Sequence, residues 1–500
     1  MKILLMKKVS YCIPAAVICL YGLVSCSFGH GPEKDSMPNI IIIYADDLGY
    51  GDLSSYGGDI PTPNIDRLGE EGIRFTDFYV SAPACTPSRY SLLTGAYPQR
   101  SKHGLTSALM PADTNYLDTS EKILPAYLKA RGYTTAIIGK WHLGFADSSG
   151  MPFLHGFDQF SGFRGGCIDF FDHVYSQLGH DWYVSGKPVQ EPGYSTDLIT
   201  GHAIDFIESV NEKPTPFFLY LPYNAPHYGK TDPGNIPENT VSLKEGMYRG
   251  TPVINSLQAP ASYLERFNHI DDPYRRAYSA MVSCLDDNIG SLLGKLEEQH
   301  LLDNTMIWFI SDNGGYSESY YGHADNDGLR GEKGTLWEGG IRVPALLRWE
   351  GHVPEGRVED SPVCNLDILP TLASILGFED ELLEEFTDGV DISPLLLRQP
   401  EHEGRESAAN DAEAFPEGAL SGEAPQAEAS TGSVSFVEAR TLFWRYRKQT
   451  ALRKGDWKLV NGEELYNLAS DRNESKNLAP EHPEKVRELQ ELFIQINQTF

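Results

Sequence analysis

The chain has few positive charges for its size. Its 500 residues include 41 lysines and arginines against 70 aspartates and glutamates, which gives a formal net charge of −29 at pH 7. Proteins that bind nucleic acid need clustered cations to replace the counterions of the phosphates. The composition therefore indicates that nucleic acid is not a partner of this protein.

Cysteine is also scarce, and its spacing is not that of a disulfide framework. Only seven cysteines occur in the chain, and three of them, Cys12, Cys19 and Cys26, fall in residues 1–26. The others lie far apart in the sequence. We therefore expect no network of stabilising disulfide bonds.

Long apolar runs are absent after residues 1–26. This N-terminal segment has a basic start and an apolar stretch, Ile13–Val24, that is short for a bilayer span, which is typical of an export signal. Its end, Leu23-Val24-Ser25-Cys26, resembles the lipobox of bacterial lipoproteins, whose cysteine is lipidated after cleavage; a simple cleaved signal peptide is the alternative. We expect an exported lipoprotein, periplasmic or anchored at the outer membrane or cell surface, whose only membrane contact is the lipid on Cys26.

Apolar runs alternate with amphipathic stretches through the body of the chain, which predicts an α/β fold. Helical spacing of apolar residues predicts helices over Asp197–Val210 and from about Pro273 to Gln299. Four continuous apolar runs predict strands covered on both faces: Asn39–Tyr44, Thr134–Ile138, Pro216–Leu221 and Thr305–Ile310. Together these elements predict a large mixed, mostly parallel sheet sandwiched by helices.

Changes in composition divide the chain into regions. Residues 37–397 form the expected main domain, in which residues 228–272 are rich in proline, glycine and asparagine and predict a long irregular excursion near the site. Residues 401–435 are dominated by Glu, Ala, Gly and Ser, so we expect a flexible acidic insertion there. Residues 436–500 predict a smaller C-terminal α+β subdomain, with an antiparallel strand pair and a final helix over Pro483–Ile496.

Polar side chains follow each of the four predicted strands at the point where the strand ends. In open α/β sheets, ligands bind beyond the carboxyl ends of the strands. We therefore expect a functional site at this edge of the sheet. It would collect carboxylates, an amide, a lysine and two histidines: Asp46, Asp47, Lys140, His142, His227, Asp312 and Asn313.

The oxygen-bearing members of this set predict a metal site. Asp46, Asp47, Asp312 and Asn313 offer the hard ligands that Ca²⁺ and Mg²⁺ prefer. An Asp-Asp pair after a strand can also be a helix cap or a turn. However, adjacent aspartates repel each other unless a cation lies between them, and this favours the metal.

The segment Cys85–Gly95 places a nucleophile-capable side chain at the start of a predicted helix. Pro87 suits a first helical turn, and Gly95 stands where such a helix would end. A helix N-terminus attracts anions, and Arg89 adds a fork of donors suited to oxyanions. The alternative interpretation is an ordinary helix start with a buried cysteine.

Two segments resemble the signatures of the sulfatase family of the alkaline phosphatase superfamily. The first is Cys-x-Pro-x-Arg-x-x-x-Leu-Thr-Gly over residues 85–95, and the second is Gly-Tyr-x-Thr-x-x-x-Gly-Lys-x-His over residues 132–142. The resemblance extends from Asn39 to about Leu397, the expected catalytic domain, and resumes in the C-terminal subdomain. It implies that the chain is a sulfuric ester hydrolase that acts on a sulfated small molecule or glycan.

The resemblance also implies the chemistry of the site. Cys85 would be oxidised to formylglycine (3-oxoalanine) by a formylglycine-generating maturation enzyme, and the hydrate of that aldehyde would be the nucleophile. Ca²⁺ would be held by the four oxygen-bearing side chains and the modified Cys85, although the residues do not exclude Mg²⁺. The remaining implied site residues bind the sulfate oxygens, hold the hydrate or contact the substrate: Arg89, Lys140, His142, His227 and Lys333.

Two other functions remain open from the sequence. Phosphonate monoester and phosphodiester hydrolases of the same superfamily can also use a formylglycine. A lipid-anchored, non-catalytic glycan-binding protein would lack a nucleophile, a metal ligand or a cation, but the chain has all of them. For a sulfatase, an acidic protein must hold an acidic ester, so a metal and a few cations must invert the potential locally.

Overall fold

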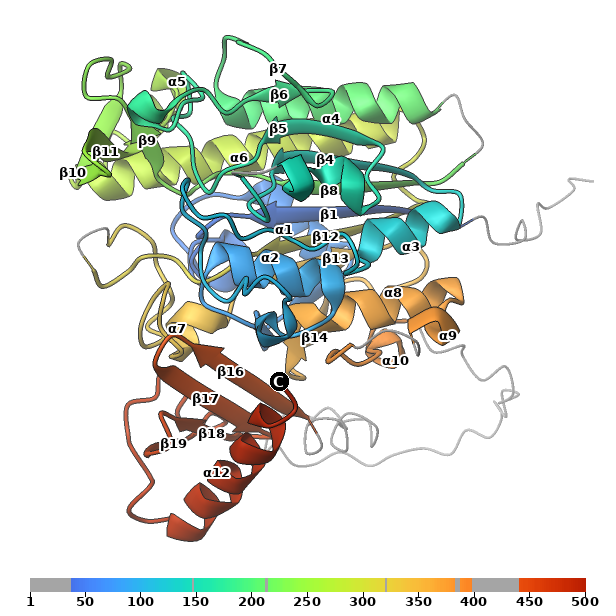
Figure 1. Ribbon diagram of the computed structural model, residues 1–500, viewed down its shortest axis with the longest axis vertical. Helices are drawn as coiled ribbons and strands as arrows, with labels where there is room; N and C mark the ends of the chain where they lie inside the picture. The colour runs from blue at the N-terminus through green and yellow to red at the C-terminus, as the bar shows by residue number, and fades with distance from the viewer. Residues whose placement is uncertain (1–36, 146–147, 212–214, 320–321, 383–386, 398–439) are drawn as a thin grey trace, which may run out of the picture. The chain divides into compact units, whose positions relative to one another are not determined.

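The computed structural model describes residues 37–145, 148–211, 215–319, 322–382, 387–397 and 440–500 (Figure 1). The predicted signal segment with Cys26 and the predicted acidic insertion 401–435 lie outside these residues. Within the described ranges, every helix is too short or too polar to cross a membrane.

A ten-stranded mixed sheet forms the centre of the main domain (Figure 1). Its inner strands β12, β1, β8, β4 and β5 run parallel, and antiparallel neighbours flank them on both sides. The predicted fold class is therefore confirmed. In spatial order the strands are β14 (Arg357–Glu359), β2 (Ile73–Phe75), β13 (Ala345–Arg348), β12 (Thr305–Ser311), β1 (Asn39–Ala45), β8 (Phe217–Pro222), β4 (Thr134–Lys140), β5 (Gln159–Phe163), β6 (Tyr183–Val184) and β7 (Lys187–Pro188).

Helices cover both faces of this sheet, as the side-chain alternation along β1 requires. Ile41 and Ile43 face a core shared with one group of helices, whereas Ile40 and Ile42 face a core shared with another. The first group is α1 (Pro63–Glu70), α4 (Ser195–Asn211) and α6 (Pro273–Glu298), and the second is α2 (Cys85–Thr94), α3 (Leu124–Ala130) and α8 (Ile368–Leu376).

Shorter elements complete the main domain. β3 (Phe78–Tyr79) pairs in parallel with β15 (Val363–Cys364). The remaining short α-helices are α5 (Ala261–Arg266), α7 (Glu338–Ile341), α9 (Glu379–Leu382) and α10 (Ser393–Leu396). Single 3-10 turns occur at Ser54–Tyr56, Pro98–Arg100, Ser148–Gly150, Pro152–His155, Ser176–Leu178 and Asn365–Asp367.

The prediction of an irregular excursion over residues 228–272 is wrong. The segment contains a three-stranded antiparallel sheet of β10 (Thr240–Tyr248), β11 (Thr251–Gln258) and β9 (Gly229–Thr231), followed by α5. Arg249 and Gly250 both have positive φ and form the two-residue turn between β10 and β11. Because β10 is largely exposed, its polar side chains concealed a strand that is held by cross-strand hydrogen bonds.

The C-terminal subdomain is an antiparallel sheet of β16 (Thr441–Tyr446), β17 (Gln449–Lys454), β18 (Trp457–Val460) and β19 (Glu464–Asn467), with helix α12 (Pro483–Asn497). The predicted strand pair and final helix are therefore present. Trp444 is buried, and its indole N–H donates to the Val80 carbonyl at 2.8 Å. The Lys458 ammonium lies 2.8 Å from carboxylate oxygens of both Glu338 and Glu474. These contacts fix the subdomain against the segments that follow β3 and contain α7.

Candidate active site

The register of the sheet brings the predicted site residues to one edge. Ala45, the last residue of β1, pairs with Ser311, the last residue of β12, so that Asp46 and Asp312 continue from adjacent strand ends. The backbone N–H of Asp312 still donates to the Ala45 carbonyl at 3.0 Å. β4 ends at Lys140, two strands from β1. The strand-end residues that the sequence singles out thus come together in space.

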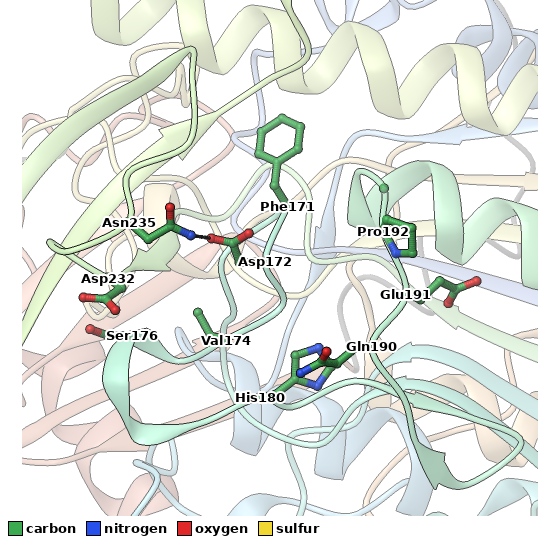
Figure 2. A pocket seen from close by; sticks show the side chains of 11 residues that line it. Phe171, Asp172, Val174, Ser176, His180, Gln190, Glu191, Pro192, Asp232 and Asn235 are labelled. Atoms are coloured by element: carbon green, nitrogen blue, oxygen red, sulfur yellow. Dashed lines mark hydrogen bonds between the residues drawn. The ribbon is translucent and has the colours of Figure 1, made fainter.

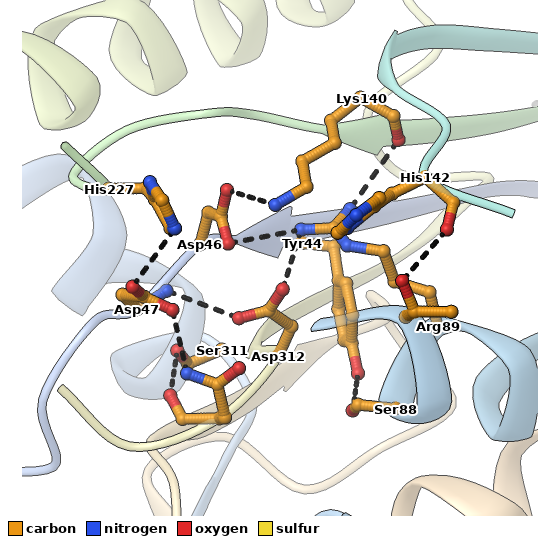
Figure 3. A network of polar contacts seen from close by, with 12 residues as sticks. Tyr44, Asp46, Asp47, Ser88, Arg89, Lys140, His142, His227, Ser311 and Asp312 are labelled. Atoms are coloured by element: carbon orange, nitrogen blue, oxygen red, sulfur yellow. Dashed lines mark hydrogen bonds and ion pairs between the residues drawn. The ribbon is translucent and has the colours of Figure 1, made fainter. Parts of the chain in front are cut away.

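Three carboxylates and three cations form one buried network at this edge. Figure 3 shows its three carboxylates with Arg89 and Lys140. The Lys140 ammonium lies 2.6 Å from Asp46 Oδ2. Arg89 donates to Asp312 Oδ2 at 2.7 Å, and Lys333 lies 2.6 Å from Asp47 Oδ1. The side chains of Arg89, Lys140, Asp46 and Asp312 are completely buried, so their charges interact in a low dielectric. Each carboxylate has a close cationic partner, and Arg89 also lies 3.6 Å from Asp46 Oδ1 and so links two of the pairs.

Cys85 is the first residue of helix α2, at the end of this network. The helix follows an extended Ala84 and ends at Gly95, whose φ of 67° is the left-handed conformation that glycine favours. The Cys85 side chain is almost fully buried. Burial raises the pKa of its thiol, although Lys140 and Lys333 act in the opposite direction. As encoded, Cys85 is therefore a protonated thiol and a poor nucleophile.

His142 follows β4, lines the same cavity as Cys85 and has a free acceptor. Its Nε2 lies 2.9 Å from the Leu109 carbonyl, an acceptor, which assigns the ring proton to Nε2. Its Nδ1 is buried and has no hydrogen-bond partner among the described residues. Burial and the nearby Lys140 lower the pKa of His142 well below its usual range, so the ring is neutral. A neutral ring with an open lone pair is suited to accept a proton.

His227 lies at the other end of the network and faces Asp47. Its Nδ1 donates to the Tyr228 carbonyl at 2.7 Å, so Nε2 points toward Asp47 Oδ2 at 3.4 Å. Burial lowers the pKa of His227 well below its usual range. A neutral ring in this tautomer turns a lone pair toward a carboxylate. Such a contact needs a cation or a proton between the two atoms.

The donor set fits a divalent cation. Ligand atoms of Asp46, Cys85 and Asp312 lie within 4.8 Å of one another. Asp46 Oδ1 and Asn313 Oδ1 are buried without a hydrogen-bond partner among the described residues, and the Asn313 amide donates to Asp47 Oδ1 at 2.8 Å. Burial and the neighbouring Asp46 raise the pKa of Asp312 to about 6. A hard cation would satisfy the orphaned oxygens and relieve this repulsion.

A cavity of about 320 Å³ opens onto Cys85. His142, His227 and Lys333 also line it, whereas the buried Arg89 and Lys140 do not. Tyr175 also lines it, and sequence reasoning missed five further members of its polar and aromatic wall: Tyr228, Lys230, Tyr316, Tyr446 and Arg447. Lys230 lies on β9, in the stretch interpreted as irregular, and Tyr446 and Arg447 come from the hairpin of β16 and β17. No local pattern in the sequence relates these positions to the strand ends.

A second, larger cavity of about 670 Å³ is acidic and differs in chemistry (Figure 2). Asp172, Glu191 and Asp232 line it together with His180, and none of its lining residues is a lysine or an arginine. Asn235 donates to Asp172 at 2.6 Å (Figure 2). Its charge is unsuited to an anion, so the smaller cavity at Cys85 is the candidate active site.

Comparisons with known proteins agree on one family. A family model described as Sulfatase matches residues 38–378. The chain is 35% identical to arylsulfatase A of Bos taurus, over 74% of this chain and 71% of that protein. It is 32% identical to arylsulfatase J of Mus musculus (91% and 70% covered) and to N-acetylgalactosamine-6-sulfatase of Rattus norvegicus (72% and 66% covered). Among solved structures, Ps i-CgsB in complex with k-i-k-neocarrahexaose is similar, with a TM-score of 0.72, 30% identity and 91% and 93% of the two chains covered.

Proposed function

The chain belongs to the sulfatase family of sulfate ester hydrolases, and from this premise we propose that it acts through a formylglycine made from Cys85. The observation that carries the proposal is the position of Cys85, a buried residue at the start of a helix that lines the same cavity as His142 and Lys333. A formylglycine there would supply, as its hydrate, one hydroxyl to attack sulfur and a second whose deprotonation lets the sulfate leave.

The chain's own side chains divide the remaining tasks. Lys333 lines the cavity and donates to the oxygens of the bound sulfate. His142 holds an open Nδ1 acceptor and takes a proton beside position 85. His227 and Lys333 line the cavity and both contact Asp47, and in the proposed reaction they are the candidates for donating a proton to the leaving alcohol. Arg89 and Lys140 act from behind the cavity, because they orient Asp312 and Asp46.

We propose Ca²⁺ as the metal, held by Asp46, Asp47, Asp312 and Asn313 with residue 85, while Mg²⁺ has the same ligand chemistry. When bound, the ion would supply positive charge against the sulfate oxygens. The three buried carboxylates are already balanced by three cations. A divalent ion would therefore leave the cluster with a net positive charge. This local inversion explains how a chain with a net charge of −29 can bind an anionic ester.

We propose that the substrate is a sulfated glycan. Support comes from relatives whose names refer to sugars, the N-acetylgalactosamine-6-sulfatase and the structure bound to a hexaose. The N-terminal segment further suggests an exported lipoprotein anchored through Cys26, and conversion of Cys85 requires a maturation enzyme as partner. Fractionation of cells that express a Cys26→Ala variant tests the anchor: the variant should leave the membrane fraction.

One experiment tests the reaction and its nucleophile together. Protein produced in a host with a formylglycine-generating enzyme is assayed for sulfate release from sulfated mono- and oligosaccharides, with phosphonate monoesters and phosphodiesters in parallel. Mass spectrometry of the peptide that contains Cys85 should show the aldehyde. The Cys85→Ala variant should be inactive, whereas Cys284→Ala, in a buried position outside the cavity, should remain active. Full activity with an unmodified thiol, or faster hydrolysis of phosphonates than of sulfates, would overturn the proposal.

A further inference from the structure

The cavity contains a buried cation that the hydrolysis of one sulfate ester does not require. Lys230, on β9, lines the cavity and is only 8% exposed. Its ammonium lies 2.5 Å from the side-chain oxygen of Asn255, a neutral group, and 4.9 Å from the centre of the Tyr228 ring. Among the described residues, no carboxylate lies within ion-pair distance of Lys230. A buried charge without a counter-ion is costly unless a ligand supplies one.

Arg447, from the C-terminal subdomain, brings a second cation to the same cavity. It lies in the turn between β16 and β17, where it adopts the positive φ of a tight hairpin turn. Its side chain is exposed, and its guanidinium lies 5.2 Å from the centre of the Tyr446 ring. Both residues line the cavity that opens onto Cys85. Within the described chain, Arg447 also lacks a carboxylate partner.

These cations differ from those of the sulfate site. Arg89, Lys140 and Lys333 each pair with a carboxylate of the buried network. Lys230 and Arg447 lie outside that network and face the space that the rest of the substrate would fill. The acidic cavity is separated from them by a short segment in which Tyr175 lines one cavity and its neighbours Val174 and Ser176 line the other. A second negative group would thus be attracted to Lys230 and Arg447 and repelled from the acidic cavity.

We propose that Lys230 and Arg447 bind a second anionic group of the substrate, so that the preferred substrate is a doubly anionic glycan. This inference rests on the proposed function, because it places the scissile sulfate at Cys85 and Lys333. The second group is a carboxylate or a further sulfate, since both offer the negatively charged oxygen acceptors that ammonium and guanidinium groups bind. Tyr228, Tyr316 and Tyr175 supply the apolar surface for the sugar ring between the two anions.

The proposal is tested with three matched substrates that share one scissile sulfate. The first has no other charge, the second carries a second sulfate on the same or the next sugar, and the third carries a uronic carboxylate. The measured quantity is the ratio of kcat/KM for a doubly charged substrate to that for the singly charged one. Wild-type enzyme should favour at least one doubly charged substrate by about 10- to 100-fold, as expected for charge-assisted hydrogen bonds. Which of the two it favours identifies the second group.

Variants then assign that preference to its residues. Lys230→Met and Arg447→Met should each lower the ratio by about tenfold, and Lys230→Arg should keep most of it. Lys448→Met is the matched control: Lys448 is the exposed neighbour of Arg447 in the same turn but does not line the cavity, so the ratio should not change. Because Arg447 is exposed, its variant decides the outcome even if Lys230→Met fails to fold.

Two kinds of failure remain distinguishable. If no sulfate ester is hydrolysed, the proposed function fails. If sulfate esters are hydrolysed but the wild type treats the three substrates alike, or a folded Arg447→Met variant keeps the full preference, the second anion site is overturned while the sulfatase reaction stands.

Discussion

At the residue scale, the pairing of buried charges determines what each substitution would do. Lys140 and Arg89 are completely buried, and each holds a carboxylate that has few other donors. Removing one member of a buried pair leaves an uncompensated charge, which destabilises a protein by about 3–5 kcal/mol. Loss of activity in a Lys140 variant is therefore not by itself evidence of contact with the substrate. Lys140 could act by contacting the substrate or by holding the Asp46 carboxylate in place. A measurement that depends on metal binding separates these two roles better than activity does.

Metal binding should stabilise the fold through Asp46. At a Ca²⁺ concentration 100 times the Kd, binding to the native state alone contributes about 2.7 kcal/mol. We expect Ca²⁺ to raise the Tm of the wild type and a chelator to lower it, as measured by differential scanning fluorimetry. The Asp46→Ala variant should not respond, because Asp46 Oδ1 is one of the orphaned oxygens.

The matched control for this prediction is Asp303→Ala, which changes an exposed aspartate away from the sheet edge. It should respond to Ca²⁺ as the wild type does. If Ca²⁺ raised the Tm of Asp46→Ala as much as that of the wild type, the ion would bind elsewhere in the molecule. If Ca²⁺ did not raise the Tm of the wild type, the proposed metal site would be wrong.

At the scale of elements, a close approach of strands sets the position of Lys140. Gly139 in β4 pairs with Gly162 in β5. A Cβ on Gly139 would lie 2.1 Å from the Pro222 carbonyl oxygen of β8, and its φ of 127° is one that other residues rarely adopt. A glycine at position 139 is therefore required for β4 to place the next residue, Lys140, in the buried network.

Substituting Gly139 should reveal this constraint. Gly139→Ala should lower the stability by about 1–3 kcal/mol or more and reduce activity, because the backbone must shift next to Lys140. Gly246→Ala, in β10, provides the comparison, since its new Cβ would meet no atom within 4 Å. Urea denaturation measures the stability of both variants, and sulfate release measures their activity. A Gly139→Ala variant as stable and as active as Gly246→Ala would contradict the argument.

How much of the fold and site the sequence predicts depends on how each element is buried. β1 and β12 are fully buried strands, so their apolar runs are continuous and unmistakable. The shared location of Asp46 and Asp312 could then be predicted, because each residue comes directly after one of these strands and parallel strands of one sheet end at the same edge. β10 is half solvated, so it carries Lys244 and Glu245 and was not recognised as a strand. Lys230 was missed with it, because its position depends on pairing with β11.

At the scale of the whole molecule, the C-terminal subdomain fixes the loop that carries Lys333. Glu338 begins α7 a few residues after Lys333, and its carboxylate is held by Lys458 of β18. Glu474, from the same subdomain, accepts a hydrogen bond from the Glu338 backbone N–H at 2.7 Å and contacts Lys458 as well. In this buried cluster Lys458 is thus shared by two carboxylates, and Glu338 has a further cation in Arg342 at 3.4 Å, which among the described residues is not paired with Glu474.

This cluster predicts a pH dependence of stability. Burial, together with the neighbouring Glu338, raises the pKa of Glu474 to about 7, although Lys458 opposes the shift. The native state therefore holds the Glu474 proton more tightly than the unfolded chain does, and the stability from that proton is lost as the pH rises through 7. Glu474→Gln cannot lose a proton there, so its Tm relative to the wild type should be higher at pH 8 than at pH 5.

Glu481→Gln, at an exposed position of the same subdomain, is the control and should show no such change between the two pH values. Thermal unfolding followed by circular dichroism at pH 5 and pH 8 is sufficient. A difference in Tm between Glu474→Gln and the wild type that does not change with pH would show that Glu474 keeps one ionisation state across this range.

The dependence of the cavity on the hairpin of β16 and β17 has a consequence for the order in which a growing chain acquires its properties. Cys85 and Lys140 leave the ribosome early and Lys230 somewhat later, whereas Arg447 and the lysine that restrains Glu338 come in the last part of the described chain. Of the two cations proposed to select the substrate, Arg447 is thus synthesised only after every residue proposed to cleave the bond, including Lys333. A nascent chain that stalls before β16 would hold every metal ligand but an open cavity, and its selectivity would be completed only by the final stretch of translation.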